Sequence, residues 1–213
     1  MAATVRPRRR RQDPTVWALY VVGLLPAVWH FYQGATGQLG ADPVKTFEHL
    51  LGLWALRFLI LTLCVTPARD LFGWNQLRYR RALGLLAFYY ALMHVATYLV
   101  LDQALNFGAV IEDILRRPFI TIGMGALLLL VPLALTSSDA AIRRLGSTWN
   151  RLHKLVYVAI AAGALHYAMS VKVIVGEPLI YAGIVVALLA YRAVRKPLLR
   201  ARRRRREAGA AAL

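Results

Sequence analysis

The sequence predicts an all-α integral membrane protein, a six-transmembrane helical bundle. Of its 213 residues, 59% are hydrophobic and only 17% are charged, and a soluble domain of this length rarely reaches such apolarity. The apolar residues form six runs long enough, or nearly long enough, to cross a bilayer. The basic residues lie at the ends of these runs and not along amphipathic faces. This placement favours membrane topology over nucleic-acid binding, despite a formal net charge of +17.

Six spans can be drawn from the apolar runs, each separated from the next by residues that interrupt helices. Pro67 and Gly73 mark the connection after the second span, and Pro118 precedes the fourth. We expect a basic arm over 1–15, a transmembrane domain over 16–195 and a basic tail over 196–213, with no room for a separate catalytic domain. The predicted spans are 16–33, 50–66, 82–101, 119–135, 155–175 and 179–195.

The distribution of lysine and arginine predicts the orientation of the bundle. Five arginines precede the first span, four cations lie in the second connection, four in the fourth, and nine follow from Arg192 onward. The opposite connections hold only four, at Lys45, Arg116, Arg117 and Lys172. Because basic residues remain in the cytoplasm, both termini are expected there. The first span could alternatively be a cleaved signal peptide, but its far end, AVWHFYQGATG, has bulky residues where a cleavage site needs small ones.

Three histidines stand out: His94 lies inside the third predicted span, His166 lies inside the fifth, and His153 comes two residues before the fifth span begins. Ionisable side chains are expensive inside a membrane, and neutral imidazole is a common axial ligand of haem iron. The third and fifth spans run parallel, so His94 and His166 stand at similar depth in the half away from the termini. We therefore predict that they coordinate one haem. Gly163 and its small neighbours leave room for a porphyrin, although they would equally suit helix packing.

His153 and Arg57 are candidates with open alternatives. His153 lies thirteen residues before His166, about 20 Å along a helix, which suits a second haem. However, the third span offers Arg80 at the matching depth, and thirteen residues turn the two imidazoles about 140° apart. The alternative is an interfacial histidine that contacts a propionate, a flavin or lipid. Arg57, inside the second span, needs a partner, either a haem propionate or another bound anion. Its alternative is a backbone carbonyl or snorkelling.

Four stretches of the chain occur in a characteristic order: HLLGLWALRFLILTLCVTPAR, RRALGLLAFYYALMHVATY, DILRRPFITIGMGALLLLVPLALTS and WNRLHKLVYVAIAAGALHY. Together they resemble the MsrQ family, the haem-binding membrane subunits of bacterial periplasmic methionine-sulfoxide reductase systems, within the wider ferric-reductase-like transmembrane group. The resemblance implies an inner-membrane protein with b-type haem that accepts electrons from a cytoplasmic flavin reductase or the quinone pool. It would deliver them to a periplasmic molybdopterin methionine-sulfoxide reductase, which repairs oxidised proteins.

The resemblance also implies site residues and a second cofactor. The histidines of the family fall on His94, His153 and His166, and the basic residue before its third span falls on Arg80 or Arg81. Arg151 is a further expected cofactor-binding cation beside His153. Family members are described as binding FMN, but no motif in this chain locates a flavin. Larger relatives have two histidines on each of the two helices, whereas the third span here has one, which argues against an inner haem held by two histidines.

Other functions remain as alternatives. The chain contains no hydrolase, phosphate-loop or dinucleotide motif, so we expect electron transfer without substrate chemistry of its own. The single cysteine, Cys64, cannot form an intramolecular disulfide or hold an iron–sulfur cluster by itself. The alternatives are a quinol- or ferric-reductase-type cytochrome b with another partner, and a transporter or scaffold whose histidines relay protons.

Overall fold

The computed structural model describes residues 13–171 and 176–210, and within these ranges the chain is helical without a strand. Six helical segments are long and apolar enough to cross a membrane, which confirms the predicted six-span fold. The elements are α1 (Pro14–Ala35), α2 (Pro43–Phe72), η1 (Leu77–Tyr79), α3 (Arg80–Thr97), the π-helical turn η2 (Tyr98–Asp102), α4 (Phe107–Arg116), α5 (Pro118–Leu135), α6 (Asp139–Leu145), α7 (Ser147–Leu152), α8 (Leu155–Ser170) and α9 (Glu177–Ala210).

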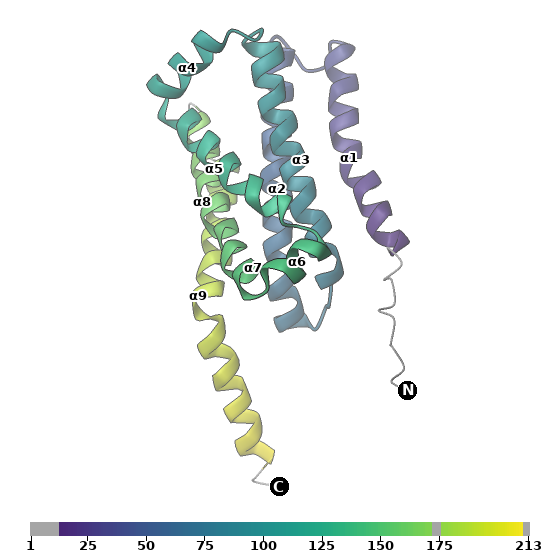
Figure 1. Ribbon diagram of the computed structural model, residues 1–213, viewed down its shortest axis with the longest axis vertical. Coiled ribbons are helices and arrows are strands. Elements are labelled where there is room, and N and C mark those ends of the chain that lie inside the picture. Colours follow the sequence, from purple (N-terminus) through teal and green to yellow (C-terminus); the bar gives the residue numbers. More distant parts are fainter. Residues whose placement is uncertain (1–12, 172–175, 211–213) are drawn as a thin grey trace.

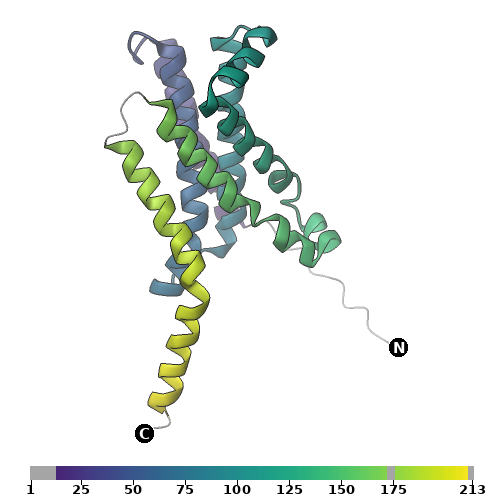
Figure 2. The same ribbon diagram turned by 90° about the vertical axis from the view of Figure 1, so that its left-hand side faces the viewer.

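Two helix pairs form the centre of the bundle (Figure 1). α2 packs along α3, and α5 packs along α8, while α9 lies against α8 and α1 stands on the far side of the α2–α3 pair. The helices α6 and α7 lie at one end of the bundle, which we call the basic end, and α4 lies at the other, which we call the α4 end (Figures 1 and 2). α1 begins and α9 finishes at the basic end, as an even number of spans requires.

The second span is longer than the sequence predicts, and the prediction that Pro67 lies in a connection is wrong. α2 continues through Pro67 to Phe72 and ends at Gly73, whose φ of 74° is the left-handed cap typical of glycine. Proline lacks an N–H, so the carbonyl of Leu63 loses its partner within the helix. In place of the missing N–H, Arg192 of α9 donates a hydrogen bond to that carbonyl.

Other helix ends also differ from the predicted limits. The connection expected after the third span contains α4, and the connection before the fifth contains α6 and α7. α9 runs past Arg195 to Ala210, so the predicted tail is helical as far as that residue. α8 ends at Ser170, and residues 172–175, the last four of the predicted fifth span, lie outside the described residues. Lys172 and the N-terminal arginines, which entered the orientation argument, lie outside the described residues.

The first span is joined to the bundle by a buried tyrosine. The hydroxyl of Tyr90, on α3, accepts a hydrogen bond of 3.0 Å from the N–H of Ala27 and donates one of 2.8 Å to the carbonyl of Gly23. The hydroxyl thus bonds both members of a pair that an α-helix joins directly, one residue after Pro26. Gly23 permits the approach, because a Cβ there would lie 2.6 Å from the side chain of Leu86. Tyr90 therefore fixes where α1 meets α3.

Candidate functional site

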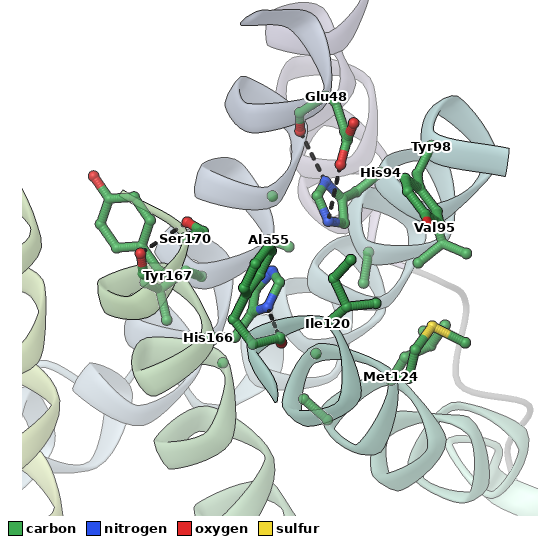
Figure 3. Close-up of a pocket in the computed structure, with 18 of the residues that line it drawn as sticks. Glu48, Ala55, His94, Val95, Tyr98, Ile120, Met124, His166, Tyr167 and Ser170 are labelled. Atoms are coloured by element: carbon green, nitrogen blue, oxygen red, sulfur yellow. Dashed lines mark hydrogen bonds and ion pairs between the residues drawn. The ribbon is translucent and has the colours of Figure 1, made fainter. Parts of the chain in front are cut away.

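A cavity of about 570 Å³ opens at the α4 end between α2, α3, α5 and α8 (Figure 3). This volume lies within the range of small-molecule and cofactor sites. Most of the wall of the cavity is apolar. Charged side chains line it only near the α4 end, where the spans begin or end. The apolar wall includes Leu53, Leu56, Leu59, Leu127 and Leu130, and the charged residues are Lys45, Glu48, Asp102 and Arg117. The cavity is therefore an apolar chamber with a polar mouth.

His94 of α3 and His166 of α8 enter this cavity from two helices (Figure 3). Their ring centroids are 6.1 Å apart, and the ring planes meet at 74°. The two histidines that the sequence predicts at similar depth thus lie together in one chamber. An imidazole–metal bond of about 2 Å on each ring would set the two centroids about 6 Å apart. The spacing of the two rings fits one metal ion between them.

Hydrogen bonds to the backbone orient both rings. The Nδ1 of His94 lies 2.8 Å from the carbonyl oxygen of Glu48, and the Nδ1 of His166 lies 2.6 Å from that of Phe119. A carbonyl oxygen can only accept, so each Nδ1 carries the proton, and a neutral ring then keeps its lone pair on Nε2. Metal-bound histidines commonly have this arrangement. The Glu48 carboxylate lies 4.0 Å from the Nε2 of His94.

Two glycines that the sequence analysis did not single out shape the site. A Cβ on Gly52 would lie 3.1 Å from Nδ1 of His94, and a Cβ on Gly123 would lie 2.7 Å from Nδ1 of His166. Each imidazole therefore packs directly on the backbone of a neighbouring helix. Gly163, which the sequence did indicate, lines the cavity with open space around it. The only signal in the sequence for Gly52 and Gly123 was that each is a glycine within a span. Which imidazole packs on each glycine depends on how the helices pack together.

Arg57 does not line this cavity. Its Nε donates a 2.6 Å hydrogen bond to the hydroxyl of Tyr181, and its Nη2 lies 3.4 Å from the carboxylate of Glu177. The guanidinium also sits 4.9 Å from the centroid of the Trp54 ring. Both polar partners belong to α9, so the predicted need for a propionate or another bound anion is met by the protein itself.

His153 lies near the basic end, away from the cavity. It is the C-cap residue of α7, and α8 begins two residues later. His153 and His166 are therefore not on one continuous helix, so the angle of about 140° expected between their imidazoles does not apply. Its Nε2 is 3.0 Å from the hydroxyl of Thr136, and its ring stacks on Trp149 at 3.9 Å between centroids. Nε2 is therefore engaged with a neighbouring side chain in this arrangement.

The three arginines predicted to bind a cofactor also lie at the basic end. Arg80 is the first residue of α3. Arg81 forms an ion pair with Asp139 of α6, and Arg151 is exposed in the last turn of α7. They are not part of the chamber that holds His94 and His166.

The donor set of the chamber limits what it can hold. Within residues 13–171 and 176–210, there is no group of three or more His, Cys, Asp or Glu side chains that could bind a metal ion. The two facing imidazoles of His94 and His166 leave most coordination positions of an ion to other ligands. A cofactor that supplies its own metal ligands, such as a porphyrin, suits this combination of two axial donors and an apolar chamber.

Comparison with known proteins agrees with this architecture. Residues 51–164 match the family described as ferric reductase like transmembrane component. The chain is 70% identical to the protein-methionine-sulfoxide reductase heme-binding subunit MsrQ of Brucella anthropi, over 90% of this chain and 86% of that one. It is 65% identical to the protein of the same name from Rhizobium meliloti, over 92% and 90% of the two chains. The Brucella ovis protein of that name is 66% identical over 95% and 94%.

The six apolar helices and the matched segment place the chain in the ferric-reductase-like class of multi-pass membrane proteins. Within that class, the chain belongs to the MsrQ family, since its similarity to three members extends over nearly the whole length of both partners. The resemblance noted in the sequence is confirmed.

Proposed function

We propose that this chain binds a b-type haem between His94 and His166 and transfers electrons across the bacterial inner membrane. The observation that carries the proposal is the pair of imidazoles in one apolar chamber, each with Nδ1 bonded to a backbone carbonyl and Nε2 left for a metal. The printed name of the relatives, heme-binding subunit, supports this choice of cofactor. A role in membrane electron transfer follows from the family and from the apolar spans.

The residues of the chain have separate roles in this proposal. Haem, when bound, supplies an iron that takes up and releases one electron. The carbonyls of Glu48 and Phe119 hold the imidazoles in a fixed orientation, and the surrounding leucines exclude water. Lys45 and Arg117 line the cavity and offer positive charge to the propionates. Since Arg57 has partners on α9, we assign it a structural role instead.

The direction of transfer rests on the basic residues. The basic end would face the cytoplasm, with both termini, because basic residues are retained on that side. Electrons would enter there from a flavin reductase or from quinol. They would leave at the α4 end to a periplasmic molybdopterin methionine-sulfoxide reductase that repairs oxidised proteins. The relatives' name supports a methionine-sulfoxide reductase as the partner.

A second cofactor at the basic end is a separate proposal, which rests on the family resemblance. Its residues would be His153, Arg80, Arg81 and Arg151, and its occupant would be a second haem or FMN. A pyridine haemochrome assay combined with flavin extraction gives the number of each cofactor per chain. If the native protein holds two haems per chain and His153→Ala holds one, a second haem at His153 is supported. An unchanged number of haems per chain in this variant would rule out His153 as a haem ligand.

Spectra of the purified protein test the main proposal. We expect b-type bands in the reduced-minus-oxidised spectrum, and we expect His94→Ala or His166→Ala to abolish the bound haem of the chamber. His30→Ala is the matched control, because His30 is bonded to Gln33 and Trp54 outside the cavity. Full haem retention in both chamber variants would refute the ligand pair. Absence of b-type bands in the native protein would favour a transporter or scaffold.

The identity of the partner needs a second measurement. We expect the reduced protein to be re-oxidised when the periplasmic reductase and a methionine-sulfoxide substrate are added together, and not with either alone. Re-oxidation only by quinone or ferric iron would instead support a cytochrome b with another partner.

A further inference from the structure

The helix α4 has three distinct sides. At roughly 100° per residue, Phe107, Ile111 and Leu115 fall within about 80° of one another. They are exposed by 64%, 59% and 79%, so no other described part of the chain covers them. Glu112 and Arg116 lie on a second side, where they form an ion pair of 3.1 Å. α4 thus exposes an apolar stripe, defined by those three residues, next to a charged side.

The third side of α4 is fixed to the bundle. Val110 is buried, and the carboxylate of Asp113 accepts a 3.0 Å hydrogen bond from the hydroxyl of Tyr98. The same carboxylate forms an ion pair of 3.0 Å with Arg117. Because these contacts set the rotation of α4 about its axis, the apolar stripe must face away from the protein core. The stripe is therefore a stable feature of the surface.

The position of α4 brings the stripe to the edge of the membrane. The span from Leu77 to Asp102 has 26 residues, whereas α5 has 18, a difference of about 12 Å in length. α5 is thus close to the minimum length for a span, and its start at Pro118 lies near the boundary of the hydrocarbon layer. In Figure 1, α4 slopes from the end of α3 down to the start of α5. Leu115, the most exposed residue of the stripe, is three residues from α5.

The neighbouring surface of α3 is apolar as well. Val100 and Leu101, in η2, are exposed by 51% and 53% on a span that must contact lipid. Leu105, which lies between η2 and α4 in the chain, is exposed by 53% as well. The stripe is thus joined through the chain to residues of a membrane-spanning segment. This continuity favours lipid over a soluble partner as the occupant of the stripe.

We propose that α4 lies in the lipid–water interface at the α4 end, with Phe107, Ile111 and Leu115 among the acyl chains and Glu112 and Arg116 towards water. An amphipathic helix with one apolar and one charged side binds a membrane surface in this way. The anchored helix leads through Arg117 directly into Phe119, whose carbonyl orients His166. Contact of α4 with lipid therefore helps to hold the wall of the chamber.

Single-cysteine labelling tests this placement in the full-length protein. Cys64 is first replaced by Ala, and Ile111→Cys and Glu112→Cys are introduced separately and labelled with a bimane fluorophore. The matched positions are adjacent on the same helix, and both side chains are exposed. The protein is reconstituted into vesicles of phosphatidylethanolamine and phosphatidylglycerol. Quenching is measured with doxyl-labelled lipid and with iodide present on both sides of the bilayer.

We expect the label at 111 to be quenched several-fold more by doxyl lipid than the label at 112, and several-fold less by iodide. Phe107→Cys and Arg116→Cys should repeat this contrast one turn away on each side. Equal iodide quenching at 111 and 112 would overturn the proposal. Protection of 111 only after the periplasmic reductase is added would also overturn it and would assign the stripe to that partner. None of these readouts depends on haem, so the result is independent of the proposed function.

Discussion

The Nη2 of Arg192 in α9 donates a 2.9 Å hydrogen bond to the carbonyl oxygen of Leu63 in α2. Leu63 stands four residues before Pro67, so its carbonyl is the one that the proline leaves without a helical donor. Unpaired carbonyls are costly in a membrane, because no water is available to bind them. The contact between α9 and α2 therefore replaces a missing bond of the central helix.

A double-mutant cycle measures this compensation. Arg192→Met should destabilise the protein by about 1–3 kcal/mol, because it leaves the Leu63 carbonyl unpaired. Pro67→Ala restores an N–H to that carbonyl, so the same arginine replacement should cost clearly less in the Pro67→Ala background. The free energy of unfolding in detergent provides the measurement.

Arg195→Met is the control for this cycle. Arg195 also joins α9 to α2, but through the carboxylate of Asp70, at 2.5 Å from its Nε. Its replacement should cost the same whether residue 67 is proline or alanine. Equal costs of Arg192→Met in the two backgrounds would contradict the assigned role of Arg192.

The close approach of Gly123 to His166 gives a second prediction. In Gly123→Ala, the new methyl group would lie less than 3.0 Å from two atoms of the imidazole, which must therefore move. We expect lost or weakened haem binding, read as haem per chain and as a shift of the Soret band. Gly125→Ala, where nothing lies within 4 Å, should retain full haem. Equal haem content in the two variants would contradict the proposed packing of the axial ligand.

Tyr90 provides a third prediction, about the docking of α1. Tyr90→Phe removes the group that bonds both the Ala27 N–H and the Gly23 carbonyl. We expect a loss of about 1–3 kcal/mol of unfolding free energy, since two buried backbone groups lose a partner unless α1 straightens to pair them. Tyr89→Phe is the control, because the neighbouring Tyr89 is exposed. Melting temperatures in detergent should separate the two variants, and the prediction fails if both melt like the native protein.

Arg57 allows a fourth prediction that separates the two interpretations of this residue. Because it pairs with Tyr181 and Glu177, Arg57→Gln should leave haem content unchanged. Haem content per chain is the measurement. Loss of haem in this variant would instead support the contact between Arg57 and a bound cofactor that the sequence predicts.

The spans could be predicted from the sequence, but the exact ends of the helices could not. Hydropathy identified each span, because the bilayer demands a minimum apolar length whatever the neighbouring helices do. It did not predict that α2 passes Pro67, since the donor to Leu63 comes from Arg192, more than a hundred residues away in the chain. It also did not predict α4, whose apolar stripe covers one side of a short helix and is too brief to count as a span.

Some residues of the candidate site could likewise be predicted from the sequence, and others could not. The positions of His94, His166 and Gly163 within their spans were sufficient to predict a shared chamber, because parallel helices bring matching depths together. The roles of Gly52 and Gly123 were not predictable, since a glycine reveals nothing about the ring that will lie on it.

The sequence alone determined the number of spans and which spans carry the histidine pair, because these depend on composition and on position along the chain. The tertiary structure decided the partners of Arg57, the carbonyls that orient the imidazoles and the outward direction of the stripe on α4. These features depend on how each helix is rotated about its own axis. That rotation is set by contacts between distant segments, which apolar spans of similar composition do not encode in their hydropathy.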